Sequence, residues 1–276
     1  MAEEGTPRLD ALQDALDAGD IGNVRRELLA LSDDELALLR EDIGAAGVER
    51  ALQAASRSRR GERRGKVLVL PGIMGSLLDR VDPRGDTERI WISITRLIGG
   101  GMEDLTLTVP AGLAPTGASA IRTAGVHRGT YLPLLTELDT QWDVRPFAFD
   151  WREDIAKSAA RLEAEVRAFG GPVHLVAHSM GGLVARFVSR HFPATWTSMD
   201  DGTGHAAGGR LVMLGTPNRG SFAPALALTG VEKLVRRLAL IDGDHRLPAL
   251  LAILATFGGL YQMLPSPLVE DRKSVV

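Results

Sequence analysis

A serine between small residues, directly after a strand-like run, is the part of this sequence best placed to do covalent chemistry. Residues 173–178 (VHLVAH) are apolar and strand-like, and Ser179 follows them. A sharp strand-to-helix turn at a serine strains its backbone and pushes the hydroxyl out above the sheet, where it can attack a carbonyl carbon. Ala177 and Gly181 flank the turn, so the pattern departs from G-x-S-x-G only at its first position. The alternative is an ordinary loop between a strand and a helix.

A second motif lies about a hundred residues earlier and could supply the other part of such a site. Residues 67–71 are a run of branched apolar residues, and the sequence PGIMG follows at 71–75. A serine hydrolase needs two backbone N–H groups that stabilise the oxyanion, one from the residue after the nucleophile and one from a loop after an earlier strand. We therefore predict Met180 and Ile73 as the two donors. A plain turn at the end of the strand is the alternative for this loop.

The order of the motifs points to a known family. Four segments resemble successive blocks of the lecithin:cholesterol acyltransferase family, over about residues 66–265: PGIMGS at 71–76, FDWR at 149–152, AHSMGG at 177–182 and GTPNRGS at 215–221. That family comprises lipases, phospholipases and acyltransferases of the α/β-hydrolase fold. The resemblance implies that Ser179 is the nucleophile and that Ile73 and Met180 form the oxyanion hole. It also implies cap or lid elements near residues 91–130 and 221–265.

The elements around these motifs alternate between strand and helix. The sequence predicts helices over 153–169 and 181–191 and strands over 67–71, 143–149, 173–178 and 210–214. Such alternation indicates a parallel sheet with helices on both faces, which binds ligands at the carboxyl ends of its strands. Ser179, Ile73, Asp150 and Thr216 all lie at such ends. We expect Trp151 and His178 to contact the substrate, with His178 shaping the pocket beside the serine.

The chain divides into a helical appendage and a catalytic domain. Residues 1–60 are expected to be an acidic helical appendage followed by a basic linker, because the first fifty residues hold thirteen acidic and five basic side chains. Ser32 and Glu35 match a capping box, which predicts a helix start. The basic run at 56–66 is typical of a solvated linker. Its alternative is a peripheral contact with anionic lipid.

The remaining residues, 66–276, are predicted to form the α/β-hydrolase domain with two insertions. Residues 77–130 are too long for a simple connection, which is typical of a cap. Residues 222–265 are apolar with helical spacing. They could form a lid over an acyl chain or be ordinary core, and the sequence favours neither.

The serine still needs a base and an acid, which follow it in this fold in the order Asp or Glu, then His. After Ser179 the histidines are His191, His205 and His245. His191 lies three turns along the predicted helix, and His205 is in a loop at the far end of the sheet. Asp242 and His245 are close together in a polar turn, although acid and base normally come from separate strand ends. We therefore expect a C-terminally incomplete hydrolase, truncated before its acid and histidine.

Composition excludes several other functions. The net charge is −3 and there are no cysteines, so the sequence predicts no nucleic-acid partner, no thiol nucleophile and no Cys-based metal site. We expect no metal and no cofactor. The first residues lack a secretion signal and no run of 18 apolar residues occurs, which favours a cytoplasmic protein without a transmembrane segment.

The sequence thus predicts a serine hydrolase or O-acyltransferase that acts on lipid-like esters through an acyl-enzyme on Ser179. One alternative is a catalytically incomplete binding or regulatory protein that keeps the pocket. Another is a carboxylesterase for small soluble esters.

Overall fold

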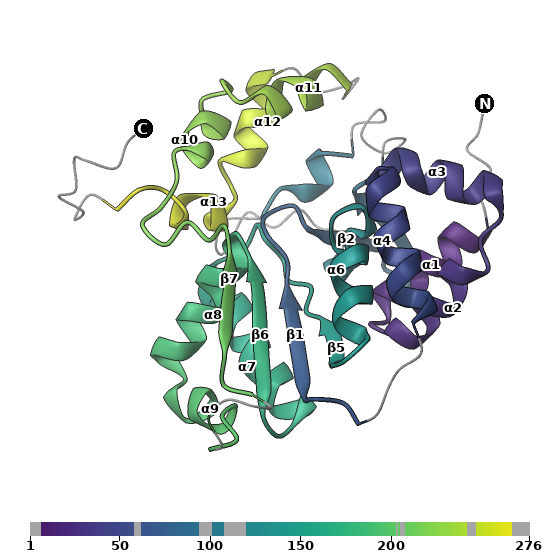
Figure 1. Cartoon of the computed structure of the whole chain (residues 1–276). Coiled ribbons are helices and arrows are strands. Elements are labelled where there is room, and N and C mark those ends of the chain that lie inside the picture. The colour runs from purple at the N-terminus through teal and green to yellow at the C-terminus, as the bar shows by residue number, and fades with distance from the viewer. Residues whose placement is uncertain are drawn as a thin grey trace.

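The chain folds into a mixed α/β structure built on a parallel sheet (Figure 1). The computed structural model describes residues 7–57, 62–93, 101–107, 120–202, 204, 208–241 and 247–266. The four strands of the main sheet lie in the order β5-β1-β6-β7, and every neighbouring pair is parallel. Their bounds are Lys66–Leu70 for β1, Asp143–Pro146 for β5, Val173–His178 for β6 and Leu211–Leu214 for β7. The four predicted strands are therefore confirmed, although β5 ends three residues earlier than expected.

The two faces of this sheet belong to two different hydrophobic cores. Side chains alternate along a strand, so Leu68 and Leu70 of β1 pack on one face and Val67 and Val69 on the other. The first face is covered by α7 (Ile155–Phe169) and α8 (Met180–His191), both of which the sequence predicts within two residues. A short helix, α9 (Pro193–Ser198), follows α8. The second face is covered by α6 (Arg128–Asp139) and the N-terminal helices.

The N-terminal helices are packed together by apolar residues on one side of each. Their bounds are Pro7–Asp17 for α1, Ile21–Leu29 for α2, Asp33–Ile43 for α3 and Ala45–Ser56 for α4. The predicted capping box is confirmed, since Ser32 Oγ accepts the Glu35 N–H at 3.3 Å and Glu35 accepts the Ser32 N–H at 2.8 Å. In Figure 1 these helices lie beside α6, and α4 and α6 contact each other along much of their length.

Ion pairs join the N-terminal helices and the linker to α6. They are Arg128–Asp42 at 2.8 Å, Arg57–Glu137 at 2.7 Å, Arg63–Asp139 at 3.1 Å and Arg25–Asp139 at 3.3 Å. Asp139 is buried, so two arginines share one carboxylate that is largely shielded from water. Arg57 and Arg63 of the basic linker thus contact protein. The predicted division of the chain at residues 60–66 stays a prediction.

The segment predicted as a cap holds a small antiparallel sheet. Its strands lie in the order β3-β2-β4, with β2 at Ser76–Val81, β3 at Thr87–Trp91 and β4 at Ala120–Val126. A short 3₁₀ helix, η1, spans Glu103–Leu105. Residues 94–100 and 108–119 of this segment lie outside the described residues, so a role as a cap stays a prediction.

Four short helices follow β7 and lie beyond the carboxyl ends of β6 and β7 (Figure 1). Their bounds are Ala223–Leu228 for α10, Lys233–Ile241 for α11, Leu247–Leu254 for α12 and Gly258–Gln262 for α13. Their inner side chains, such as Leu250 and Phe257, join the core on the α7–α8 side. Their outer side chains include Phe222, Leu226, Leu234 and Leu240, which are exposed. The inner sides of these helices are therefore part of the core, and a role of residues 222–265 as a lid over an acyl chain stays a prediction.

Candidate active site

Ser179 is the residue at which β6 turns into α8, and its backbone is strained. Its φ is 49° and its ψ is −119°, a conformation that non-glycine residues rarely adopt. The Ser179 N–H donates to the carbonyl oxygen of Leu214, at the end of β7, at 2.8 Å. The turn is thus held by the neighbouring strand. Strain of this kind is maintained only where the surrounding structure enforces it, and it is found most often at functional sites.

The glycines after the serine let three strand ends come close together. A Cβ added to Gly181 would lie 2.9 Å from Leu70 Cβ, at the end of β1. A Cβ added to Gly182 would collide with the side chain of Thr216, just after β7. The Thr216 hydroxyl oxygen is itself buried and has no hydrogen-bond partner among the described residues. The small residues predicted at the turn are needed because α8 begins against its neighbouring strands.

The loop after β1 lies directly against Ser179. A Cβ added to Gly72 would be 3.0 Å from Ser179 Cβ and 3.1 Å from Nδ1 of His178. Gly72 is therefore required for close approach. The left-handed backbone of this loop is found instead at Met74, with a φ of 61°. Among the described residues, Met74 and Ser179 are the two non-glycine residues with positive φ, and each belongs to one of the two predicted motifs.

Hydrogen bonds fix this loop on several sides. The Gly75 N–H donates to Gly72 O at 3.0 Å, and the His127 N–H donates to Gly75 O at 2.9 Å. The indole N–H of Trp91 donates to Met74 O at 2.9 Å. No described residue accepts the Ile73 N–H. Met180 is the first residue of α8, where N–H groups have no partner within the helix. Both predicted oxyanion donors are thus available, although their role stays a prediction.

Tyr131 of α6 joins the two motifs through its hydroxyl. The Gly72 N–H donates to this oxygen at 2.8 Å, and the same oxygen is 2.9 Å from Nδ1 of His178. Burial raises the pKa of Tyr131 to about 12, so its hydroxyl keeps its proton at neutral pH. Burial also lowers the pKa of His178, which favours a neutral imidazole. The Tyr131 hydroxyl, the His178 ring and the Gly72 amide therefore form a neutral hydrogen-bonded group beside the serine.

The FDWR block forms part of the core under the site. Asp150 accepts two side-chain hydrogen bonds from Arg152, at 2.9 Å and 2.6 Å, and both residues are buried. Arg152 also donates to Leu105 O at 2.7 Å. The Trp151 ring is 1% exposed and packs edge-on against Trp91 and Phe257. Contacts of Trp151 and His178 with a substrate stay predictions. The Trp151 side chain packs in the core.

No described histidine is hydrogen-bonded to the Ser179 hydroxyl. His174 lies at the start of β6, where its Nδ1 accepts the Arg210 N–H at 3.2 Å. His191 stacks on Phe187 at the far end of α8, with ring centroids 4.1 Å apart. Asp242, His205 and His245 lie outside the described residues. The structure brings the nucleophile and the oxyanion loop together, and the base and the acid stay unassigned.

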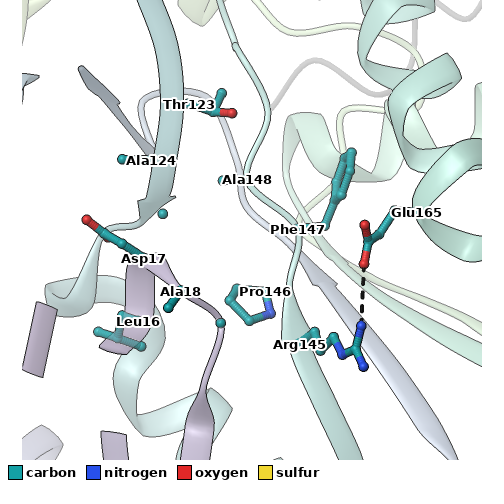
Figure 2. Close-up of a pocket in the computed structure, with 12 residues that line it drawn as sticks. Leu16, Asp17, Ala18, Thr123, Ala124, Arg145, Pro146, Phe147, Ala148 and Glu165 are labelled. Carbon is teal, nitrogen blue, oxygen red and sulfur yellow. Dashed lines mark ion pairs between the residues drawn. The ribbon is translucent and has the colours of Figure 1, made fainter. Parts of the chain in front are cut away.

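A separate polar cavity of about 350 Å³ lies between the α1–α2 turn, β4 and β5. Figure 2 shows Asp17 and Thr123 on one side of it, and Pro146 and Phe147 on the other. None of its lining residues belongs to the serine site. Within the described residues, no group of three or more His, Asp or Glu side chains could hold a metal ion, and no helix is long and apolar enough to cross a membrane.

Comparison with known proteins gives one distant resemblance. The chain is 32% identical over 81 residues to a bovine (Bos taurus) protein named lysosomal phospholipase A and acyltransferase. That protein belongs to the lecithin:cholesterol acyltransferase family. The match covers 25% of this chain and 20% of the bovine protein, so the chain corresponds to about a fifth of its length. No protein-family model matches the chain.

Tyr131 is the site residue that the sequence did not indicate. It lies 59 positions after Gly72 and 47 before His178, within α6. The chain has two tyrosines, and their scarcity is the one signal that could have drawn attention to it. The pairing itself depends on how α6 packs on the sheet.

Proposed function

We propose that this chain carries the nucleophilic serine of an α/β-hydrolase that acts on lipid-like esters, by hydrolysis or by acyl transfer. The observation that carries the proposal is the strained backbone of Ser179 at a strand-to-helix turn, with the Gly72 loop packed against it. The distant resemblance to a phospholipase A and acyltransferase supports the same chemistry. The parallel sheet with helices on both faces supports the fold.

In the proposed reaction, Ser179 Oγ attacks the ester carbonyl carbon and its proton passes to a base. The oxyanion that forms is stabilised by the N–H groups of Ile73 and Met180. When the intermediate collapses, the alcohol leaves with a proton and the acyl group stays on Ser179. Water or a second alcohol then takes the acyl group in the second step.

We propose that the acid and the base come from outside the described residues. Among the described strands, β7 pairs with β6 alone. Three of its four residues are exposed: Val212 at 46%, Met213 at 40% and Leu214 at 40%. An apolar edge of this kind is unusual in a folded protein unless another strand or helix covers it. The exposed edge supports the expectation that further strands, carrying the acid and the histidine, complete the sheet.

A fluorophosphonate probe tests the nucleophile. We expect slow labelling of the wild-type chain at Ser179 and none in Ser179→Ala, because the probe reacts with an activated serine. Ser189→Ala is the matched control, since its hydroxyl lies on the same helix and bonds to Arg186 O. Persistent labelling in Ser179→Ala would show that the nucleophile is wrongly assigned. A wild-type chain that never labels would favour the binding-protein alternative.

Added imidazole separates a missing base from one that is present. If the base is absent, imidazole can accept the serine proton and should speed labelling several-fold. If His245 acts as the base, imidazole should change little, and His245→Ala should then remove labelling. This result would decide between an incomplete site and an unusual Asp242–His245 pair.

The outer face of α11 favours a lipid-like substrate over a small soluble ester. Leu234 and Leu240 are 46% and 85% exposed, and the exposed Lys233 and Arg237 lie on the same helix. Exposed apolar side chains with basic ones nearby can contact the acyl region and the anionic headgroups of a membrane surface. This helix therefore fits a peripheral membrane contact better than the linker at 56–66 does. Lys66 of that linker bonds to Phe169 O at 2.7 Å and Gly170 O at 2.6 Å.

The substrate class can be tested with vesicles and esters. The wild-type chain should sediment with vesicles of phosphatidylcholine and phosphatidylglycerol, and Leu234→Ser with Leu240→Ser should weaken this association. Longer nitrophenyl esters should be preferred over the acetate. A preference for the acetate, with no vesicle binding, would support the small-ester alternative. The cytoplasmic location expected from the sequence stays a prediction.

A further inference from the structure

The Tyr131 hydroxyl is within hydrogen-bond distance of a residue from each motif of the serine site. It accepts the Gly72 N–H from the oxyanion loop, and it contacts His178, the residue before the nucleophile. The tyrosine is 2% exposed, and its ring lies edge-on to the His178 ring with centroids 6.0 Å apart. This arrangement needs an explanation beyond packing, because a phenylalanine would fill the same space without a buried hydroxyl.

We propose that Tyr131 is a positioning residue of the serine site, whose hydroxyl holds the Gly72 amide and directs its own hydrogen to Nδ1 of His178. The inference rests on the proposed function, since it assigns the oxyanion loop a catalytic task. It adds a residue to the site that neither motif contains.

The first consequence concerns which backbone N–H can reach the oxyanion. Gly72 and Ile73 are adjacent, and either amide could in principle serve the site. Because the Gly72 N–H is bonded to Tyr131, the Ile73 N–H is the one left without a protein acceptor among the described residues. A Cβ on Gly75 would lie 2.7 Å from the same hydroxyl, so the far end of the loop also packs against it. Tyr131 thus selects the donor and fixes its direction before substrate binds.

The second consequence concerns the proton on His178. A neutral tyrosine hydroxyl has one hydrogen to donate, and it already accepts from Gly72. Nδ1 of His178 is the remaining polar atom within hydrogen-bond distance, at 2.9 Å. If the hydroxyl donates to Nδ1, then the neutral ring carries its hydrogen on Nε2. His178 is therefore fixed as a hydrogen-bond donor through Nε2 beside the serine.

The position of Tyr131 is itself fixed by α6. The His127 N–H at the start of this helix bonds to Gly75 O, so the helix meets the loop at two points one turn apart. Arg128 is paired with Asp42 of α3, and Asp139 is paired with Arg25 of α2. Each end of α6 is thus tied to the N-terminal helices, which makes it a rigid support for the tyrosine.

The test compares Tyr131→Phe with Tyr261→Phe in the full chain. Tyr261 is the chain's other tyrosine, is 47% exposed, and its hydroxyl donates to Ala255 O at 3.1 Å. We expect the rate of fluorophosphonate labelling, measured with added imidazole, to fall about 10-fold in Tyr131→Phe, since small displacements of reacting groups are costly. Tyr261→Phe should label at the wild-type rate. With an ester substrate that the enzyme turns over, kcat of Tyr131→Phe should fall while its KM stays within about two-fold of the wild-type value.

Two further measurements do not need catalysis and separate this inference from the proposed function. In Ser179→Ala, ¹⁵N NMR should show His178 with Nδ1 unprotonated and Nε2 protonated at neutral pH, and Tyr131→Phe should shift the Nδ1 signal. Amide exchange at Gly72 should be slow in the wild type and at least 10-fold faster in Tyr131→Phe.

The inference is overturned if His178 carries its hydrogen on Nδ1, or if Gly72 exchanges as fast in the folded wild type as an exposed amide. Equal labelling of the folded Tyr131→Phe and Tyr261→Phe variants would overturn it as well. If Tyr131→Phe does not fold, the His178 spectrum of Ser179→Ala and the Gly72 exchange of the wild type still decide. Loss of Ser179 labelling in every variant would count against the proposed function alone.

Discussion

The helices at the two ends of the chain differ in how completely they are packed. In the N-terminal group, α1–α4, most apolar side chains lie between the helices and α6, with Leu12, Val24, Leu28 and Leu39 fully buried and Leu29 and Leu38 exposed. In the C-terminal group, α10–α13, large apolar side chains are found on the inner and the outer sides alike. The first group therefore completes one face of the sheet. The second covers the strand ends near the serine while leaving apolar surface open.

The starts of the helices do not separate the two groups as cleanly. In the N-terminal group, α2 and α3 begin with side-chain caps from Asp20 and Ser32, and α4 begins with none. In the C-terminal group, α10 and α13 begin with no side-chain cap, whereas Glu232 accepts the N–H groups of Leu234 and Val235 at the start of α11. Short helices with exposed apolar faces are typical of elements that move or meet another surface, as a lid over a lipid site would.

The largest expected difference comes from one substitution made in each group. Leu28→Ala removes a fully buried side chain from α2, so the free energy of unfolding should fall by about 3 kcal/mol. Leu240→Ala removes a side chain that is 85% exposed on α11, and the change should stay within about 0.5 kcal/mol. Urea unfolding of both variants measures this directly. Similar losses in the two variants would mean that α11 is packed as tightly as α2.

A smaller difference is expected within α6, where the N-terminal group is attached. Asp139 is buried and pairs with Arg25 and Arg63, so Asp139→Ala leaves two cations without their carboxylate and should cost about 2 kcal/mol. Glu137 pairs with Arg57 on the exposed side of the same helix, and Glu137→Ala should cost less than about 0.5 kcal/mol. Thermal unfolding of the Asp139→Ala and Glu137→Ala variants, in low and in high salt, measures both losses. A neutral Asp139→Ala would show that apolar packing alone attaches these helices.

The capping box of α3 should contribute less to the free energy of unfolding than the Asp139 ion pairs do. Ser32→Ala removes the side-chain acceptor for the Glu35 N–H and should lower the free energy of unfolding by about 1 kcal/mol. Ser56→Ala is the matched control, because its hydroxyl bonds to Gln53 O at the exposed end of α4. Chemical denaturation with both variants measures the cap. An equal effect of the two changes would mean that helix packing, rather than capping, sets where α3 begins.

The weakest expected effect is a dependence of stability on pH. Burial lowers the pKa of both His127 and His178 in the folded chain, so the unfolded chain binds protons more readily. Their contribution to stability is therefore present above the unfolded pKa, near 6.5, and is lost as the pH falls through the folded values. Urea midpoints at pH 7.5 and 5.5 should fall on acidification. The fall should shrink when both histidines are replaced by glutamine, and an unchanged slope would contradict this assignment.

Much of the site could be predicted from sequence because its parts are local. A strand followed by a serine and, one residue later, two glycines can form few structures, so Ser179, β6 and α8 could be predicted from neighbouring residues. The loop after β1 was predicted for the same reason, since Pro71 ends the strand and Gly72 permits close approach. The capping box of Ser32 and Glu35 is likewise a contact across three residues.

Contacts between distant residues were decided by the tertiary structure alone. Tyr131 reaches Gly72 only because α6 packs on the Val67–Val69 face of the sheet, and no spacing in the sequence encodes that distance. The left-handed backbone at Met74 is accompanied by hydrogen bonds from distant residues, Trp91 to Met74 O and His127 to Gly75 O. Whether residues 222–265 form a lid or ordinary core was also undecided by periodicity. An apolar helix buries whichever face its neighbours cover, and the sequence alone does not say where those neighbours lie.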